Sequence, residues 1–337
     1  MATIQKYFNP NEMTMVEQKA TRVRDERIDA VKYWLVMLVI TAHVVMRKEF
    51  ADSTSCAVLW NWLCTFDIPL FIFISGYFSR KKDRKDFLPS IWKLLEPLII
   101  FHVIGVCFYE DSLSVRTILT PWFVLWYLLS LICWRLMLQI IPDRILNQTK
   151  LILITTFCIS ILAGFLPFDR MFSLQRTLSY MPFFFLGYYM KGKNLYLPDK
   201  YKPLCIVFLI GMLAILFFYP HRLNVLKHAN PYSNIYGAAI RMFFFAIAVP
   251  MSVAFINVCP KTAWIARQGR LTMQYYIFHA LLILPIMTVV GKLGVPMSFI
   301  TAAIITTGIA MGLSLVMKIP YVKTLTNPSL FFWGKKK

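Results

Sequence analysis

The chain alternates between long apolar runs and short polar connections. A bilayer core about 30 Å thick requires about 20 mainly apolar residues for each helix that crosses it. Ten runs reach or approach that length, and we predict a helix for each: 28–46, 57–78, 91–108, 119–140, 150–166, 175–190, 203–220, 235–256, 272–290 and 299–317. The pattern therefore predicts an all-α, polytopic integral membrane protein with about ten transmembrane helices.

Polar segments at both ends delimit the apolar region. Residues 1–27 contain no apolar stretch of the kind found in signal peptides. We expect a cytosolic N-terminal segment at 1–27, a membrane domain at 28–317 and a basic cytosolic tail at 318–337. The connections between the runs are too short for a separate soluble domain, so we expect the protein to act in or beside the bilayer.

The charge distribution predicts the orientation of the chain. Only 15% of the residues are charged and 58% are hydrophobic, whereas soluble domains contain about 25% charged residues. Lys and Arg are concentrated in the connections on the N-terminal side and are sparse in the alternate ones. The positive-inside rule then places both termini in the cytosol. It also accounts for the net charge of +20, and no zinc-finger spacing or basic–aromatic stripe indicates a nucleic-acid partner.

The first run contains Asp29, Lys32 and His43. Lys32 and His43 are three helical turns apart within about 20°, and Asp29 lies about 40° from the same line. Polar groups at membrane depth usually mark a pathway or a lined cavity. The stripe is therefore a path from the cytosol to a reaction centre, or His43 is a core histidine bonded to a neighbouring helix. By contrast, Lys93 and Arg135 lie near helix ends and are expected to extend toward the membrane surface.

The second run ends in a group of residues on the predicted cytosolic side. Ser75 and Gly76 are small, and the basic residues Arg80, Lys81 and Lys82 follow them. Small residues allow helices to approach closely. The basic residues anchor the helix on the cytosolic side, and they could also bind the anionic headgroup of a cofactor.

Other residues point to the predicted outer side. Trp122 and Trp126 lie in the fourth run, where they form an interfacial aromatic belt or stack on a sugar ring. Arg176 and Tyr180 lie near the outer mouth in the sixth run, and His279 lies in the ninth. These residues are the candidates for contacts with a substrate that arrives from outside.

An ordered set of residues between about 27 and 290 matches a known family. The set comprises Asp29, Lys32 and His43; Phe66, Pro69, Leu70, Phe71, Ser75, Gly76 and Tyr77; Pro97; Trp122 to Leu128; Arg176, Pro182, Phe183, Phe184, Gly187 and Tyr188; and Thr272, Tyr276 and His279. Together these residues resemble the membrane-bound acyltransferase family 3, and within it the branch of fucose 4-O-acetylase and related acetyltransferases. Many members have Arg where this chain has Lys32, and related sequences often have His where it has Asp67.

The resemblance implies an integral-membrane enzyme of about ten helices. It would move an acyl group, usually acetyl, from cytosolic acyl-CoA to a glycan or a lipid-linked sugar. We therefore expect acetyl-CoA as the donor, a bacterial cytoplasmic membrane as the location, and the bilayer and polysaccharide-assembly proteins as partners. The sequence contains no H-E-x-x-H motif and no Cys/His cluster, so we expect no metal.

The resemblance and the residue chemistry together assign roles. His43 and Asp29 are the predicted catalytic residues, with His43 as the base because imidazole exchanges protons near neutral pH. We expect direct acyl transfer rather than an acyl-histidine intermediate. The predicted donor-binding residues are Lys32, Arg80, Lys81, Lys82, Ser75 and Gly76. The predicted acceptor-binding residues are Trp122, Trp126, Arg176, Tyr180 and His279.

Other functions are compatible with the same pattern. A transporter or flippase for a glycan or lipid also needs polar residues at membrane depth, although no inverted repeat of the transporter type is visible. A catalytically idle scaffold in a polysaccharide-assembly complex is a third reading. Within the enzyme reading, a donor such as succinyl-CoA and the identity of the acceptor sugar stay open.

Overall fold

A computed structural model describes residues 24–110, 112–167, 170–219, 221–296, 298–319, 322 and 326. Within this part of the chain all regular secondary structure is helical. The α-helices are α2 (Glu26–Val45), α3 (Thr54–Tyr77), α4 (Arg84–Tyr109), α5 (Val115–Leu119), α6 (Trp126–Ile140), α7 (Asp143–Leu146), α8 (Thr149–Ala163), α9 (Leu174–Tyr189), α10 (Lys202–Leu216), α11 (Tyr236–Val258), α12 (Ala263–Gly269), α13 (Thr272–Lys292) and α14 (Phe299–Val316). Short 3₁₀ turns are η1 (Lys48–Phe50), η2 (Met171–Ser173), η3 (Asp199–Tyr201) and η4 (Asn224–Lys227).

The predicted all-α class is confirmed, and each of the ten apolar runs coincides with a helix. In the described part of the chain, six helices are long and apolar enough to cross a membrane: α2, α3, α4, α11, α13 and α14. Helices α6 and α8 are apolar but shorter. Ten crossings and cytosolic termini stay predictions. Residues 1–23 of the predicted N-terminal segment, and the predicted tail apart from residues 318, 319, 322 and 326, lie outside the described residues.

One predicted helix is interrupted. Hydropathy predicts a single helix over 119–140, but α6 begins only at Trp126, so the prediction is wrong over 120–125. Phe123 in this turn has a left-handed backbone, with φ of 43°, and the backbone N–H of Trp122 donates to His102 Nδ1 at 3.2 Å. Trp122 in this turn is buried in the protein interior, with 6% of its surface exposed. Hydropathy alone does not distinguish an apolar residue that is buried in protein from one that faces lipid.

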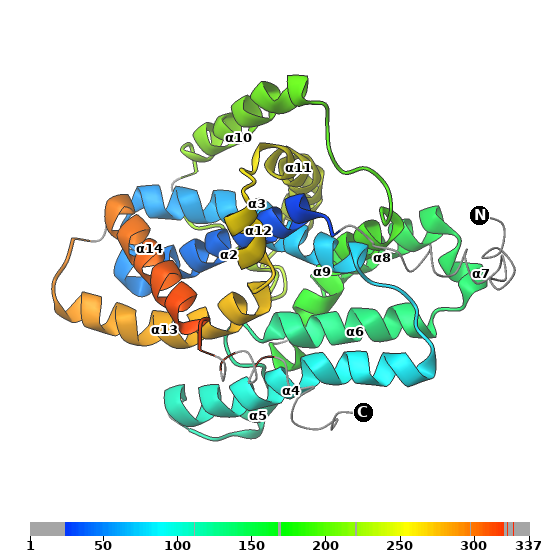
Figure 1. Cartoon of the computed structure of the whole chain (residues 1–337), viewed down its shortest axis with the longest axis horizontal. Coiled ribbons are helices and arrows are strands. Elements are labelled where there is room, and N and C mark those ends of the chain that lie inside the picture. Colours follow the sequence, from blue (N-terminus) through cyan, green and yellow to red (C-terminus); the bar gives the residue numbers. More distant parts are fainter. Residues whose placement is uncertain are drawn as a thin grey trace, which may run out of the picture.

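Helix α2 occupies the centre of the molecule. It begins after Asp25, whose carboxylate accepts hydrogen bonds from the N–H groups of Arg27 and Ile28 at 2.9 and 3.2 Å and so caps the helix. Helices α3, α12, α13 and α14 pack around it (Figure 1). Gly269 of α12 permits this packing, since a Cβ atom there would lie 1.7 Å from the carbonyl oxygen of Asp29.

Helices α3 and α9 approach closely through two glycines. A Cβ atom at Gly76 would lie 1.9 Å from the carbonyl oxygen of Phe184, and one at Gly187 would lie 2.0 Å from that of Phe73. Small residues at such a crossing let two membrane helices touch along their backbones. Gly76, which we predicted to bind the donor, therefore serves the contact between two helices.

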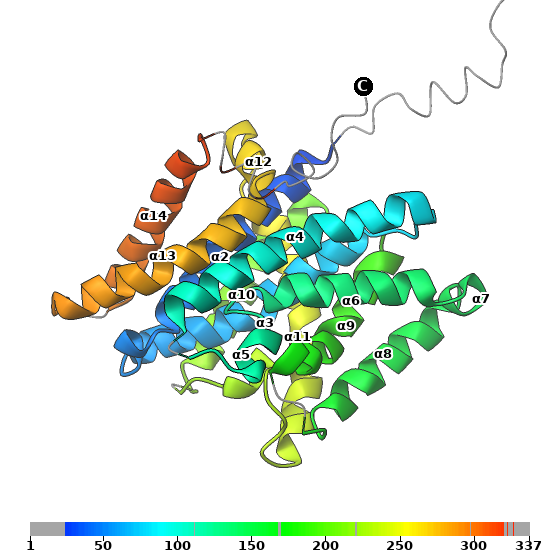
Figure 2. The ribbon, with the colours of Figure 1, turned by 90° about the horizontal axis from the view of Figure 1, so that it is seen from below.

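Helices α4 and α13 lie side by side across one face of the molecule (Figure 2). The Tyr109 hydroxyl donates to the carbonyl oxygen of Leu281 at 2.9 Å. The ring centroids of Phe101 and Phe278 are 5.3 Å apart. This pairing places α13 between α4 and the central α2, so residues on one face of α13 reach the space around α2.

Candidate active site

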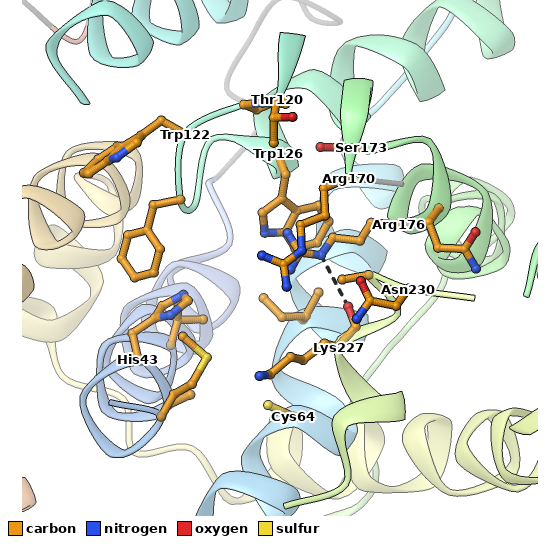
Figure 3. A pocket seen from close by; sticks show the side chains of 18 of the residues that line it. His43, Cys64, Thr120, Trp122, Trp126, Arg170, Ser173, Arg176, Lys227 and Asn230 are labelled. Carbon is orange, nitrogen blue, oxygen red and sulfur yellow. Dashed lines mark hydrogen bonds between the residues drawn. The ribbon is translucent and has the colours of Figure 1, made fainter. Parts of the chain in front are cut away.

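A cavity of about 830 Å³, called the large cavity below, lies at the His43 end of α2 (Figure 3). Its walls come from α2, α3, α4 and α9, from the turn before α6, and from η4 with the residues after it. This volume falls in the range of about 300–1,000 Å³ that is typical of small-molecule sites. Residues in its lining include His43, Cys64, Asp67, Trp122, Trp126, Arg170, Arg176, Tyr180, Lys227 and Asn230.

His43 lines this cavity beside a second histidine. The ring centroids of His43 and His279 are 5.4 Å apart. His279 is fully buried, and its Nδ1 lies 3.0 Å from the carbonyl oxygen of Tyr275, so Nδ1 holds the proton and donates it. His43 Nδ1 and His279 Nε2 are buried and have no hydrogen-bond partner among the described residues. The two neighbouring rings therefore each carry a buried nitrogen without a partner among the described residues.

Four of the predicted acceptor-binding residues line the same cavity. The Arg176 guanidinium lies 4.8 Å from the ring centroid of Trp126, and the Tyr180 ring stacks on Trp126 with centroids 5.7 Å apart. The Tyr180 hydroxyl donates to the carbonyl oxygen of Leu226 at 3.1 Å. Trp122, Trp126 and Arg176 also surround the open space that faces His43 in Figure 3. The structure thus brings these residues together, while their binding of an acceptor stays a prediction.

Trp122 is fixed by its neighbours on α4. His102 Nε2 donates to the carbonyl oxygen of Ile118 at 2.9 Å, which leaves His102 Nδ1 to accept from Trp122 N–H. Gly105 makes room for the indole, since a Cβ atom there would lie 2.1 Å from it. The Tyr109 ring stacks on Trp122 with centroids 5.2 Å apart. His102 therefore positions the turn before α6 and does not reach the cavity itself.

A smaller cavity of about 180 Å³, called the small cavity below, lies beside Lys32 on the other part of α2. It is enclosed by α2, α3, α4, α6 and α13, and its lining is mainly apolar and aromatic. The polar residues in the lining are Lys32, Ser75, Arg135, Thr272 and the two tyrosines Tyr127 and Tyr276.

Aromatic side chains separate the two cavities. Tyr276 lines the small cavity, and its ring centroid is 6.0 Å from that of His279, which in turn contacts His43. The Tyr276 hydroxyl donates to the carbonyl oxygen of Val124. The Tyr127 ring lies 5.4 Å from that of Tyr276, and its hydroxyl is 2.5 Å from Ser75 Oγ. A line of contacts therefore runs from the small cavity through Tyr276 and His279 to His43.

Comparison with known proteins identifies the family to which this arrangement belongs. The family model Acyl_transf_3, described as "Acyltransferase domain", matches residues 25–319, which is most of the chain. The chain belongs to the acyltransferase 3 family. It is therefore a membrane enzyme that transfers acyl groups, and this membership favours an enzyme over a transporter or an idle scaffold. The comparisons with curated proteins and with solved structures found no match.

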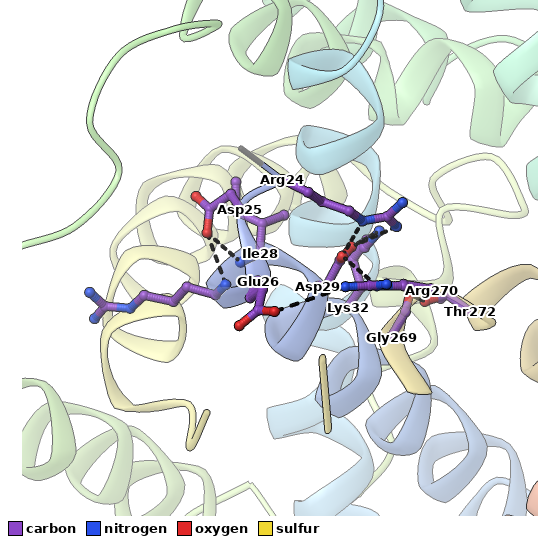
Figure 4. A network of polar contacts seen from close by, with 10 residues as sticks. Arg24, Asp25, Glu26, Ile28, Asp29, Lys32, Gly269, Arg270 and Thr272 are labelled. Carbon is purple, nitrogen blue, oxygen red and sulfur yellow. Dashed lines mark hydrogen bonds and ion pairs between the residues drawn. The ribbon is translucent and has the colours of Figure 1, made fainter. Parts of the chain in front are cut away.

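In this acyltransferase Asp29 lies far from His43, although we predicted that both residues are catalytic. Its carboxylate is 2.5 Å from Arg24 Nε, 2.6 Å from Lys32 Nζ and 3.7 Å from Arg270 Nε (Figure 4). His43 lies 14 residues further along the same helix, about 21 Å at 1.5 Å per residue. The structure does not bring Asp29 to His43, because a rigid helix holds them apart. Asp29 instead fixes the ammonium of Lys32 beside the small cavity.

The predicted donor-binding residues divide into two groups. Lys32 and Ser75 line the small cavity. Arg80 is exposed outside it, and Lys81 Nζ is held by Asp143 and by the carbonyl oxygen of Ile141, each at 2.5 Å. Lys81 thus joins the start of α4 to the segment after α6 and does not face a cavity.

Lys82 belongs with Arg80 outside the small cavity. Its backbone N–H donates to Gln139 Oε1 at 3.2 Å. Burial lowers the pKa of Lys82, and the nearby charges of Arg135 and Arg80 lower it further. Lys82 therefore joins a cluster of positive charge next to the small cavity, although it does not line the cavity itself.

The structure places two residues differently from what the sequence suggested and adds a third. Arg135 lines the small cavity, whereas its place near a helix end suggested a side chain directed to the membrane surface. His279, predicted to bind the acceptor, does not line the large cavity and instead contacts His43. Lys227 lines the large cavity and was missed. The only sequence signal for Lys227 was a lone Lys in a predicted outer connection, and such residues are usually solvated.

Proposed function

We propose that this acyltransferase moves an acetyl group from cytosolic acetyl-CoA to a hydroxyl of a cell-surface or lipid-linked glycan, in the cytoplasmic membrane of a bacterium. The observation behind this proposal is that two cavities of different size lie on either side of the His43–His279 pair. A transfer between two substrates that approach from opposite sides requires such an arrangement. The choice of acetyl as the acyl group and of a glycan as the acceptor comes from the resemblance of the sequence to the acetylase branch.

The small cavity suits the donor. Its volume of about 180 Å³ and its mainly apolar lining fit a thin chain such as the pantetheine arm of CoA. Lys32 and Arg135 line the cavity, and Arg80 and Lys82 lie close by. Phosphate groups bind such clusters through charge-assisted hydrogen bonds. The donor would thus place its phosphates at the basic cluster and its thioester toward Tyr276.

The large cavity suits the acceptor. Trp122, Trp126 and Tyr180 provide aromatic surface, which packs against the apolar face of a sugar ring, while polar groups around them bind hydroxyls. A hydroxyl beside His43 would face the donor across the histidine pair. Tyr276 stands between the two cavities, so we infer that its side chain turns aside when both substrates are bound.

The reaction follows from this placement. His43 removes the proton of the acceptor hydroxyl as the oxygen attacks the thioester carbonyl. The tetrahedral intermediate collapses, the carbon–sulfur bond breaks, and the sulfur leaves as the CoA thiolate. The imidazolium of His43 returns the proton to that thiolate. The products are an O-acetyl ester and free CoA, and no additional reactant is required.

His279 would orient His43 for this step. A separation of 5.4 Å between the ring centroids leaves room between the ring edges for an N–H···N hydrogen bond of about 3 Å. Because His279 Nδ1 donates to the carbonyl oxygen of Tyr275, His279 Nε2 could accept a hydrogen bond from the Nδ1–H of His43. That bond would fix the tautomer in which His43 Nε2 carries the lone pair, which is the form that a base needs.

A transfer assay tests the proposal. Purified protein in nanodiscs is given acetyl-labelled acetyl-CoA and total envelope glycans, and both glycan label and free CoA are measured. The wild type and His221→Ala, whose exposed side chain makes it a control, should label the glycan, while His43→Ala should not. Labelled glycan from His43→Ala at the wild-type rate would refute the base role. Movement of glycan across the bilayer with no release of CoA would refute acyl transfer.

A further inference from the structure

Basic side chains gather around the large cavity. Among the described residues, its lining contains two acidic side chains, Asp67 and Glu110, and five basic ones, Arg47, Arg116, Arg170, Arg176 and Lys227. Arg47 has an acidic partner in Glu49, at 3.7 Å. Buried charges are normally paired or contact a ligand. Cations in such a wall offer contacts to a negatively charged occupant.

Arg176 and Lys227 form the part of this lining that can bind an anion. Arg176 Nε donates to the backbone carbonyl oxygen of Lys227 at 3.3 Å, which holds the guanidinium beside η4. Lys227 Nζ lies 5.3 Å from the ring centroid of Trp60. In the described part of the chain no ion pair joins either residue to a carboxylate. Figure 3 shows the side chains of Arg176 and Lys227 at the cavity, joined by the hydrogen bond from Arg176 to the Lys227 backbone.

One acidic residue in the described wall, Asp67, forms no ion pair with this pair of cations. Asp67 is 1% exposed, and its carboxylate accepts a hydrogen bond from the backbone N–H of Ile68 at 2.6 Å. No ion pair to Asp67 occurs among the described residues. Within the described residues, Arg176 and Lys227 therefore have no ion pair to a carboxylate of the wall.

Lys227 shows the energetic consequence of this crowding. Burial lowers the pKa of Lys227, and the positive charges of Arg170, Arg176 and Arg222 lower it further. A negative group bound between Lys227 and Arg176 would stabilise both charged forms. A neutral sugar would instead displace water from the two cations without supplying a counter-charge, and this desolvation is unfavourable.

We propose that the acceptor is an acidic glycan, whose carboxylate or phosphate group binds Arg176 and Lys227 while a hydroxyl of the same or the adjacent sugar faces His43. The guanidinium of Arg176 can form two parallel hydrogen bonds to such an oxyanion, and Lys227 adds a point charge. The cavity of about 830 Å³ accommodates a sugar together with its charged substituent. This inference rests on the proposed glycan acetylation and specifies its acceptor.

The test uses the labelled transfer assay with three pools of the same envelope glycans. One pool is untreated, one has its carboxyl groups reduced to alcohols, and one has its phosphate removed with aqueous hydrofluoric acid. The wild-type protein should label the untreated pool, and one of the two treatments should abolish labelling. Loss after carboxyl reduction identifies a carboxylate, and loss after phosphate removal identifies a phosphate.

Variants connect the charge requirement to these residues. Lys227→Gln keeps a polar side chain without the charge and should raise the KM for the glycan about tenfold or more, because a charged hydrogen bond is lost, with a smaller change in kcat. Lys227→Arg should restore most of the affinity. Arg176→Gln should act in the same direction. Lys292→Gln removes one positive charge at an exposed position outside the cavity and should leave the KM unchanged.

The outcomes separate this inference from the proposed function. Equal labelling of all three pools, or an unchanged KM in Lys227→Gln and Arg176→Gln, overturns the acidic acceptor and leaves glycan acetylation intact. Absence of label in every pool with wild-type protein overturns glycan acetylation, and the acidic acceptor with it. A KM that rises equally in Lys292→Gln also overturns the inference, because the effect then reflects overall charge.

Discussion

The two cavities use basic residues in different ways. Beside the small cavity, Lys32 is held at 2.6 Å by Asp29, so its charge is paired and its position is fixed. Beside the large cavity, Lys227 and Arg176 have no ion pair to a carboxylate within the described residues. Lys32 is already neutralised by Asp29, so it is held in place before a ligand binds. Lys227 and Arg176 depend on a ligand for their counter-charge. The difference indicates a donor site that is ordered in advance and an acceptor site that selects by charge.

The walls of the cavities differ as well. The small cavity is narrow and mainly apolar, while the large one is wider and combines aromatic rings with polar groups. Both approach the His43–His279 pair, which belongs to α2 and α13. Variants on one side should therefore change the kinetics of one substrate alone, and variants of the histidines should change the turnover of both.

The largest effect is expected where the two cavities meet. His43→Ala should lower kcat by about 10²–10⁴-fold, the usual contribution of a general base, and should change neither KM by much. Steady-state kinetics with labelled acetyl-CoA measure the effect, and the thermal unfolding midpoint checks the fold. A retained kcat in folded His43→Ala would show that the two cavities do not share this residue as a base.

The next effect should be confined to the donor. Arg135→Gln removes a positive charge from the small cavity and should raise the KM for acetyl-CoA about tenfold or more, while the KM for the glycan stays constant. Lys150→Gln, at an exposed position on α8, is the control with the same change in charge. If Arg135→Gln changed the glycan KM instead, the assignment of the two cavities would be reversed.

A smaller effect is expected from the partner of His43. His279→Phe removes the nitrogen that would accept a hydrogen bond and should lower kcat about tenfold, in keeping with the loss of one buried hydrogen bond. His279→Gln retains an accepting oxygen and should recover much of this loss. Equal kcat values for both variants would show that His279 fills space and does not orient His43. A pH–rate profile of each variant provides a second measurement.

The smallest effect should come from the aromatic wall of the large cavity. Trp126→Leu removes the ring that contacts Arg176 and Tyr180 and should raise the KM for the glycan about three- to tenfold, as expected when an aromatic contact is lost. The KM for acetyl-CoA should not change. Isothermal titration with the acceptor pool or kinetics would detect this shift, and an equal change for both substrates would indicate a general disturbance of α6.

Much of the fold could be predicted because helix formation is local. Runs of apolar residues predicted ten helices, and each run coincides with a helix of the described residues, whereas the short helices α5, α7 and α12 were not predicted. The exception is 120–125, where a left-handed Phe123 and the bond between Trp122 and His102 bend the chain. That bond joins residues 20 positions apart, so hydropathy along a short window could not reveal it.

The candidate site was only partly predictable. The stripe of Lys32 and His43 follows from helical spacing on one helix, and each residue lines one of the two cavities. The rise of the same helix also separates Asp29 from His43, whereas residue type alone predicted that both are catalytic. Residue type suggested that His279 would contact the acceptor, but packing places it behind His43.

The sequence by itself determined the class of the protein, its helices and the residues able to perform acyl chemistry, since these depend on hydropathy, helical period and side-chain type. Only the tertiary structure decided which of those residues meet. It brought α13 against α2 so that His279 contacts His43, and it placed Lys227 from η4 next to Arg176 of α9. Such contacts depend on how helix faces pack, through close approaches such as Gly269 on Asp29, and this information is distributed over the whole chain.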